Sequence, residues 1–236
     1  MIASRGALAA IAAVLVGCAG DVDPPWQLDH ERIIAVRATP PRIATGDRAV
    51  LDALLGFKGA PVAEQAPEDA AVVSPASLAG AVARDGDRWV VTAPDEPALA
   101  AARSSLGLAA GAPVPLVVRV SYAAGALVAT KTVWLGATGA DPTMPDVKID
   151  GASAAAAAAE LVVAPLVDVP LSVPLDDASY DVTWLSSCGT MHDFDLPAAY
   201  LRVEADDPAE GQLAVVIRDA SGGVAWRVWP IRARMP

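Results

Sequence analysis

Alternation of apolar and polar residues with a period of two is the feature that most restricts how this chain can fold. In the segment 114–122, the apolar residues Val114, Leu116, Val118, Val120 and Tyr122 occupy every second position. Side chains spaced in this way lie on one face of an extended strand. The segment 127–135 follows after Ala123-Ala124-Gly125-Ala126. The sequence therefore predicts a hairpin whose alternation fixes its register.

Similar segments occur earlier in the chain, separated by Pro, Gly and Asp residues. We expect strands at 32–39, 48–55 and 87–93, with Pro40-Pro41 ending the first and Thr45-Gly46-Asp47 forming a turn before the second. A short helix is predicted at 97–106, where Leu99, Arg103 and Leu106 have helical spacing.

The segment from Gly136 to Pro145 is rich in Gly and Pro and predicts a boundary between two parts of ordinary domain size. Beyond it we expect six strands, which is typical of a β-sandwich: 146–149, 161–173, 180–186, 199–205, 212–219 and 224–231. The segment 212–219 is apolar on both sides except at its charged end, because Leu213, Val215 and Ile217 alternate with Ala214, Val216 and Arg218.

The N-terminus has the layout of an export signal. Arg5 is the only charged residue before Asp21, and residues 6–16 form an uncharged apolar run. As a helix, eleven residues reach about 16 Å, whereas the hydrocarbon core of a membrane is about 30 Å thick. The run therefore predicts a signal peptide and not a membrane-spanning anchor.

The residues Leu15-Val16-Gly17-Cys18 resemble the lipobox of bacterial lipoproteins. This resemblance implies that the signal peptide 1–17 is removed and that Cys18 carries a lipid anchor. It also implies sorting to the outer membrane, because Ala19 stands where an aspartate would signal retention in the inner membrane. The alternative is an ordinary secretory signal with an incidental cysteine. Several acyl chains would make the attachment stable.

Two parts of the mature chain resemble immunoglobulin-like modules of bacterial surface lipoproteins. The first likeness rests on 33–41 and 44–47, and the second, to the polycystic-kidney-disease type, rests on Val182-Thr183-Trp184 and on 215–226. The resemblance implies an all-β chain with two tandem immunoglobulin-like β-sandwich domains at 31–138 and 139–236, after a lipidated tether at 18–30. Cys188 follows Trp184 and has no partner, so the antibody-type disulfide core is absent.

Composition excludes some classes of function. The chain has 17 Lys and Arg against 28 Asp and Glu, a net charge of −11, and its basic residues are scattered, which argues against nucleic-acid binding. No Walker-type loop, dinucleotide-binding glycine pattern or paired cysteine or histidine motif is present. We therefore expect no cofactor, no metal and no catalysis.

A few polar residues still need weighing as site candidates. Ser186 or Ser187 with His192 and Asp193 can be written as a catalytic triad, but they are near neighbours without a nucleophile-elbow motif. Carboxylates at Asp193 and Asp195, with Asp176-Asp177 and Asp206-Asp207, are candidate calcium ligands, although their spacing matches no calcium loop. A solvated acidic loop is the favoured interpretation.

Cys188 and the tryptophans are interpreted as core residues. Cys188 has even spacing from Trp184, which places both on one strand face and predicts a small buried side chain instead of a reactive thiol. Trp184, Trp226 and Trp229 are expected to pack in the core, with a carbohydrate-stacking surface as the alternative.

Together these features predict a non-catalytic, lipid-anchored protein of the cell envelope that acts as a structural spacer or protein-interaction module. The alternative is a ligand- or glycan-binding adhesion lipoprotein, and an envelope hydrolase has the least support. The predicted membrane contact is the lipid anchor alone. The sequence does not identify the protein or glycan partner.

Acylation of Cys18 is directly testable. Growth with labelled palmitate should label the protein, and mass spectrometry should find the lipid on a mature N-terminus at Cys18. Both signals should disappear in Cys18→Ser. An unmodified mature N-terminus at another residue would contradict the lipobox interpretation.

Overall fold

A computed structural model describes residues 24–154 and 160–234. The predicted signal peptide, the lipobox residues Leu15, Val16 and Gly17, and Cys18 lie outside the described residues. Within the described ranges, no helix has the length and apolarity needed to cross a membrane.

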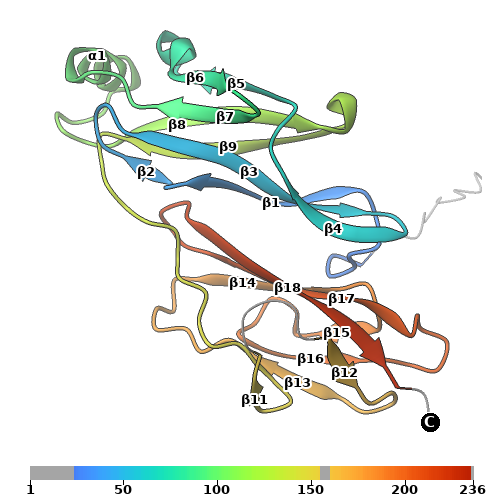
Figure 1. Cartoon of the computed structure of the whole chain (residues 1–236). Helices are drawn as coiled ribbons and strands as arrows, with labels where there is room; N and C mark the ends of the chain where they lie inside the picture. The colour runs from blue at the N-terminus through green and yellow to red at the C-terminus, as the bar shows by residue number, and fades with distance from the viewer. Residues whose placement is uncertain (1–23, 155–159, 235–236) are drawn as a thin grey trace, which may run out of the picture.

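The first part of the chain forms two sheets that we call the N-terminal pair (Figure 1); the first is antiparallel, and in the second only β2 pairs in parallel, with β9. In the first sheet, β3 pairs with β1 on one side, and with β7 and β4 one after the other on the other side. Its strands are β1 (Arg32–Thr39), β3 (Arg48–Phe57), β4 (Ala60–Gln65), β6 (Val82–Asp85) and β7 (Arg88–Thr92). The second sheet has the order β2-β9-β8-β5 and contains β2 (Arg42–Ile43), β5 (Asp69–Ser74), β8 (Val114–Tyr122) and β9 (Leu127–Leu135).

The second part forms another two sheets, the C-terminal pair. One has the order β11-β10-β13-β16-β15 and the other the order β12-β18-β17-β14. Their strands are β10 (Lys148–Ile149), β11 (Ala152–Ser153), β12 (Leu161–Val163), β13 (Val169–Ser172), β14 (Asp181–Ser186), β15 (Thr190–His192), β16 (Ala198–Arg202), β17 (Glu210–Arg218) and β18 (Val224–Ala233). The prediction of an all-β chain is thus confirmed.

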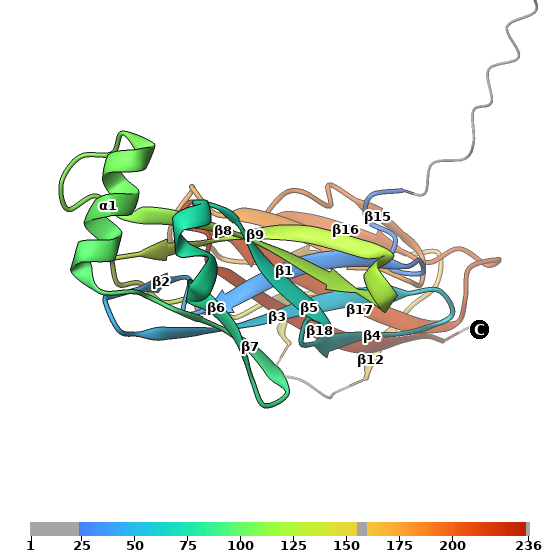
Figure 2. The ribbon, with the colours of Figure 1, turned by 90° about the horizontal axis from the view of Figure 1, so that it is seen from above.

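The predicted hairpin and helix are present at the expected positions. Strands β8 and β9 pair without interruption from Val114↔Leu135 to Tyr122↔Leu127. The helix α1 (Glu96–Leu106) begins behind Asp95, whose side chain accepts a hydrogen bond from the N–H of Ala98 at 3.0 Å. Both views show α1 at one end of the N-terminal pair (Figures 1 and 2). In the part of the chain that the structure describes, the remaining helical turns are the 3₁₀ segments η1 (Ala76–Ala81) and η2 (Ala123–Gly125).

Each pair encloses its own apolar core. Alternate side chains of β8 point into the N-terminal core, where Leu116, Val118 and Val120 are fully buried. The C-terminal core contains Trp184, Trp229 and Cys188, all fully buried, which confirms the interpretation of these three residues. Packing of inward-facing residues from two sheets is the ordinary way in which β layers become stable.

A third apolar cluster lies between the two pairs, and we call this contact the seam. The strand β17 is buried on both faces: Leu213, Val215 and Ile217 belong to the C-terminal core, whereas Ala214 and Val216 belong to the third cluster. Across the seam, the N-terminal pair contributes Ile34, Ala35 and Leu54. The two-sided apolar pattern of 212–219 is therefore the sequence signal of the seam.

The last part of the predicted tether 18–30 packs against the fold from its first described residues onward. The Leu28 N–H donates to Ser186 O and the Ser186 N–H donates to Trp26 O, both at 2.9 Å, so this segment lies beside β14. Leu28 is buried in the seam. Glycine is required at Gly56, where an added Cβ would lie 2.9 Å from His30 O. This segment thus joins both pairs.

The prediction of a single strand at 161–173 is wrong. The chain instead forms β12, which pairs in parallel with β18, and then β13, which belongs to the opposite sheet. Pro165 and the left-handed backbone of Leu166, at φ 61°, lie between them. Because proline removes a backbone donor, the strand ends there and the chain crosses between sheets.

Burial at the seam can be measured by a matched set of valine substitutions. Val216→Ala should lower the free energy of unfolding by about 2 kcal/mol, as should Val215→Ala, because both side chains are fully buried. The control Val162→Ala should change it by less than about 0.5 kcal/mol, because Val162 on β12 is 47% exposed. Chemical denaturation measures all three. A negligible effect of Val216→Ala would mean that the seam does not form in solution.

Candidate functional site at the seam between the sheet pairs

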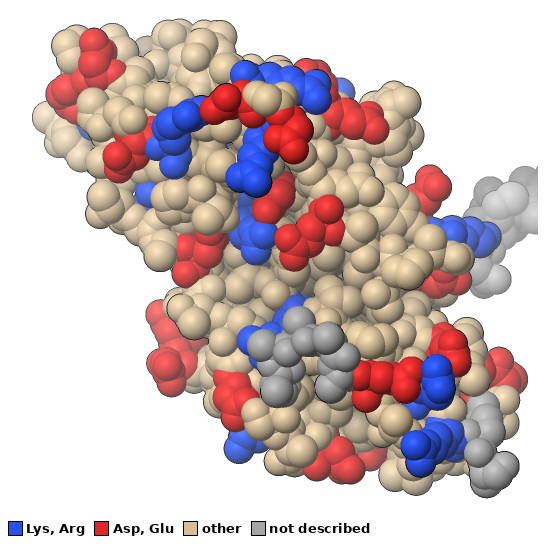
Figure 3. All heavy atoms as spheres, in the orientation of Figure 1, with Lys and Arg blue, Asp and Glu red and all other residues tan. Residues whose placement is uncertain are grey.

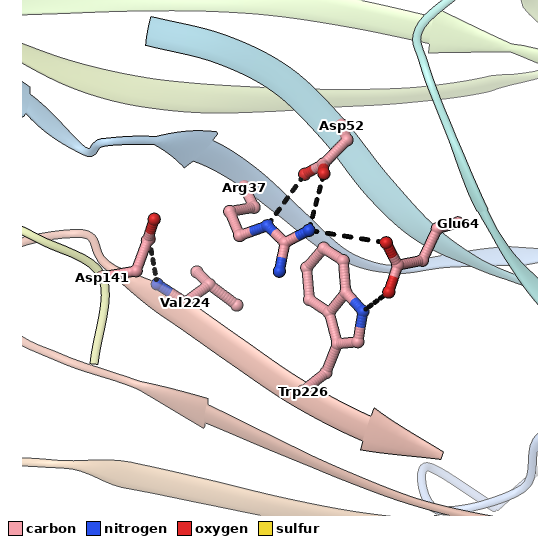
Figure 4. A network of polar contacts seen from close by, with 6 residues as sticks. All are labelled: Arg37, Asp52, Glu64, Asp141, Val224 and Trp226. Carbon is pink, nitrogen blue, oxygen red and sulfur yellow. Dashed lines mark hydrogen bonds and ion pairs between the residues drawn. The ribbon is translucent and has the colours of Figure 1, made fainter. Parts of the chain in front are cut away.

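A charged network covers one rim of the seam (Figure 4). The Arg37 guanidinium on β1 donates to both carboxylate oxygens of Asp52 on β3, at 3.0 and 2.6 Å. Its Nη2 is also 3.5 Å from Glu64 of β4. Two parallel N–H···O bonds fix a guanidinium in one orientation. The N-terminal pair therefore presents Arg37 toward its neighbour.

Trp226 on β18 meets this network from the C-terminal pair. The Arg37 guanidinium lies over the indole ring, 3.9 Å from its centroid, and the indole Nε1 donates to Glu64 Oε1 at 2.6 Å. An arginine in this position is attracted to the ring face. Burial lowers the pKa of Arg37, but the hydrogen bond and charge of Asp52, with smaller contributions from Glu64 and Asp141, outweigh it and raise the pKa. The guanidinium stays charged.

The segment that connects the two pairs also contributes contacts to this rim of the seam. Asp141 Oδ1 accepts from the N–H of Val224, where β18 begins, at 3.0 Å (Figure 4). Gly223 packs so closely that an added Cβ would lie 2.7 Å from Pro142. The predicted boundary at 136–145 is therefore attached to the start of β18.

Two cations, the half-buried Arg218 and the buried Lys131, hold another part of the rim. Arg218 donates to Ile34 O at 2.9 Å and to Thr183 Oγ1 at 3.1 Å, which joins β17 to β1 and β14. Lys131 on β9 donates to Gly222 O at the tip of the β17–β18 hairpin. Burial lowers the pKa of Lys131 to about 8, although the charges of Asp141 and Asp219 act to raise it.

Grooves open along the rims of the seam. One of about 670 Å³ is lined by Arg37, Asp52, Glu64, Arg88 and Asp141, and one of about 420 Å³ shares Glu64 with it. Basic and acidic atoms are interspersed on the N-terminal pair just above the line where the pairs meet (Figure 3). The grooves offer both positively and negatively charged hydrogen-bonding groups, which suits a polar binding partner.

The structure does not assemble the candidate triad. The Ser186 hydroxyl donates to Cys188 O at 2.6 Å, and the Ser187 hydroxyl accepts from the N–H of Gln212 at 2.8 Å. His192 stacks on Tyr200, with ring centroids 4.9 Å apart. Both serine hydroxyls are therefore hydrogen-bonded to backbone groups.

Side chains in the acidic loops accept hydrogen bonds from nearby backbone N–H groups and so stabilise turns. Asp177 Oδ1 accepts from the N–H of Ser179 and Asp207 Oδ2 accepts from the N–H of Glu204, at 2.8 and 2.7 Å. Within residues 24–154 and 160–234, no group of three or more His, Cys, Asp or Glu side chains is placed to hold a metal ion.

Cys188 and Trp226 differ in their surroundings. The Cys188 thiol donates to Pro208 O at 2.8 Å, and burial raises its pKa to about 11, with a smaller contribution from Asp207. A protonated, buried thiol is unreactive. Trp226, which was expected in the core, is only half-buried at the seam, where Arg37 covers its ring face.

Comparisons with known proteins give distant likenesses only. No family model matches the chain, and the search of curated proteins gives no match. Murine CEACAM1b is 11% identical over 85% of this chain and 99% of its own, with a TM-score of 0.29. The two tandem V-type regions of VCBP3, a v-region-containing chitin-binding protein, are 13% identical over 86% and 100%, with a TM-score of 0.32. A nucleoside hydrolase-related hypothetical protein from Saccharophagus degradans is 16% identical over 40% of this chain and 26% of its own, also with a TM-score of 0.32. Likenesses at this level carry no argument about family or function.

The burial of Lys131 predicts a pH-dependent difference in stability. Between pH 8 and about 10.5, the unfolded chain keeps a proton on this amine that the folded chain has released, so this group adds stability as the pH rises. Lys131→Met removes that contribution. The free energy of unfolding of Lys131→Met minus that of wild type should therefore fall by roughly 2–3 kcal/mol from the lower to the upper end of this pH window.

Urea unfolding at several pH values measures this difference, and comparison of the two proteins cancels the titration of all other groups. Lys58 is exposed, so Lys58→Met serves as the control and should parallel wild type. Parallel curves for Lys131→Met and wild type would show that the amine is not buried at the seam.

Proposed function

We propose that this chain is a non-catalytic, lipid-anchored protein of the cell envelope that acts as a structural spacer or protein-interaction module. In this proposal the sheet pairs are two tandem immunoglobulin-like domains, 31–138 and 139–236. Cys18 carries the lipid, and the outer membrane is the location. The lipobox resemblance supports the anchor, and the packing of four sheets supports the modules.

The seam is the observation that carries the proposal of a spacer. Two modules joined only by a linker move relative to each other by default. Here a buried apolar cluster, the Arg37–Trp226 contact and the N-terminal segment all hold one pair against the other. A rigid double module keeps a fixed distance between its ends, as a spacer requires.

The alternative is a ligand- or glycan-binding lipoprotein. The polar grooves at the rim favour it, since carboxylates and guanidinium groups can bind sugar hydroxyls. The three tryptophans considered as a stacking surface do not favour it, because Trp184 and Trp229 are fully buried and Arg37 covers a face of Trp226. An envelope hydrolase has the least support, because the candidate serine hydroxyls are bonded to backbone groups.

Membrane fractionation tests the anchor. The wild-type protein should enter the outer-membrane fraction, and Cys18→Ser should remain in the soluble fraction or in the inner membrane as an unprocessed precursor. A wild-type protein recovered only in the soluble fraction would refute lipid anchoring.

Crosslinking in living cells followed by pull-down separates the two classes of function. A protein-interaction module should give a reproducible protein adduct, and a glycan binder should give saturable binding on a glycan array. A plain spacer should give neither. Hydrolytic activity that disappears in Ser186→Ala would contradict a non-catalytic role.

A further inference from the structure

Three exposed apolar side chains gather at one corner of the C-terminal pair. Val162, Leu166 and Val167 are 47%, 52% and 55% exposed. Val162 and Val167 line the same hollow of about 200 Å³, and Leu166 precedes Val167 in the turn after β12. Single exposed apolar residues are ordinary on a protein surface, but a group of them marks a contact surface. We call these three residues the apolar corner.

The backbone of Leu166 has a conformation that disfavours leucine. Its φ of 61° lies in the left-handed region, where a side chain other than glycine or asparagine is strained. The Leu166 N–H donates to Val203 O at 2.8 Å, which fixes the turn. Outliers of this kind concentrate at functional sites. The turn therefore holds an apolar side chain in solvent at a position where the backbone favours a small or polar residue.

The apolar corner lies at the end of the C-terminal pair where the chain enters the fold. Because β12 and β18 run in parallel, both end where β17 begins and where β14 ends. At this end, Gln27 forms a bridge to Ser186, the last residue of β14. In the sheet, β14 and β12 are three strand spacings apart, or about 14 Å. The turn with Leu166 and Val167 follows β12, so it lies near the entering segment.

The length of the chain before this segment limits its distance from the proposed anchor. Only the six residues 18–23 precede Pro24, the first described residue, in the proposed mature chain. An extended chain spans at most about 3.6 Å per residue, so Pro24 cannot lie more than about 22 Å from a lipidated Cys18. The apolar corner is therefore within reach of the bilayer surface.

The charges near the corner argue against an anionic lipid surface. Four carboxylates share two guanidinium groups there: Asp168 and Glu204 pair with Arg202, and Glu160 and Glu210 pair with Arg232. Each group of three keeps an excess negative charge, which anionic headgroups repel. A zwitterionic headgroup carries no such penalty.

We propose that the apolar corner is a second membrane contact, at which Leu166 and Val167 insert into the interface of a zwitterionic phospholipid bilayer and orient the anchored protein. A few apolar side chains bind a bilayer weakly. A short tether raises their effective concentration to roughly millimolar, so a weak contact is enough. The inference rests on the proposed lipid anchor and adds an orientation to it.

Photo-crosslinking tests this contact. Cys18 of the chain 18–236 is coupled to a maleimide phospholipid in phosphatidylcholine vesicles, while the buried, protonated thiol of Cys188 does not compete. A benzophenone side chain in place of Val167 should form at least about fivefold more lipid adducts than one in place of Val73, which is 54% exposed on β5. Mass spectrometry counts the adducts. Equal yields at the two positions would overturn the proposal.

A polar substitution separates membrane contact from a structural role. Leu166→Asn suits the left-handed backbone, so it should leave the melting temperature unchanged or raise it, and it should lower the adduct yield from Val167 several-fold. Leu196→Asn is the matched control, because Leu196 is 49% exposed and precedes β16 at the opposite end of that sheet. An unchanged yield in Leu166→Asn would refute the contact. A clear fall in its melting temperature would also do so, since Leu166 would then pack within the fold.

Irradiation and sedimentation of the uncoupled chain test a second copy as the occupant. A monomer without protein–protein adducts supports the proposal, whereas a dimer crosslinked through position 167 would assign the corner to a second copy. Because the phospholipid is attached chemically, these results do not depend on natural acylation. The fractionation of Cys18→Ser tests the anchor separately, so the failure of either proposal is recognisable by itself.

Discussion

The fold depends on the burial of both faces of β17. A sheet in a simple sandwich buries one face and exposes the other, but Val215 and Val216 are both fully inaccessible to solvent. Exposure of the seam face would leave Ala214, Val216 and Val224 as one apolar surface on the C-terminal pair. The N-terminal pair covers that surface with Ile34, Ala35 and Leu54. The two pairs therefore stabilise each other in the same way that two sheets of one sandwich do.

The charged residues at the seam follow from this apolar contact. Strands that leave the buried region carry polar side chains at its rim, where they must find partners or remain hydrated. Arg37 finds Asp52 in its own sheet and Trp226 across the seam. Lys131 is buried against the hairpin tip, and burial there lowers its pKa. The apolar cluster supplies the contact, and the rim fixes the relative orientation of the pairs.

The sequence predicts local features well and long-range features poorly. The β8–β9 hairpin is predictable because alternation and turn occur within one continuous segment. The strand β4 is not predictable in this way, because Pro61 and Glu64 interrupt any alternation of apolar residues. It forms a strand because it pairs with β3. The two-sided apolar pattern around Val216 is visible in the sequence, but the sequence does not show that Leu54 packs in the same cluster. Glu64 and Trp226 are 162 residues apart, so no motif could have joined them.

The entry point of the chain gives the seam a mechanical role under the proposed anchoring. Residues 26–28 lie beside β14 of the C-terminal pair before the chain begins β1 of the N-terminal pair. A pull on a lipidated Cys18 would therefore act first on the hydrogen bonds with Ser186 and on Leu28, which is buried between the pairs. Both pairs would share that load at the seam, instead of passing it through the segment 136–147, which connects β9 to β10. A tether attached in this way would hold both sheet pairs, because its last residues are part of the contact between them.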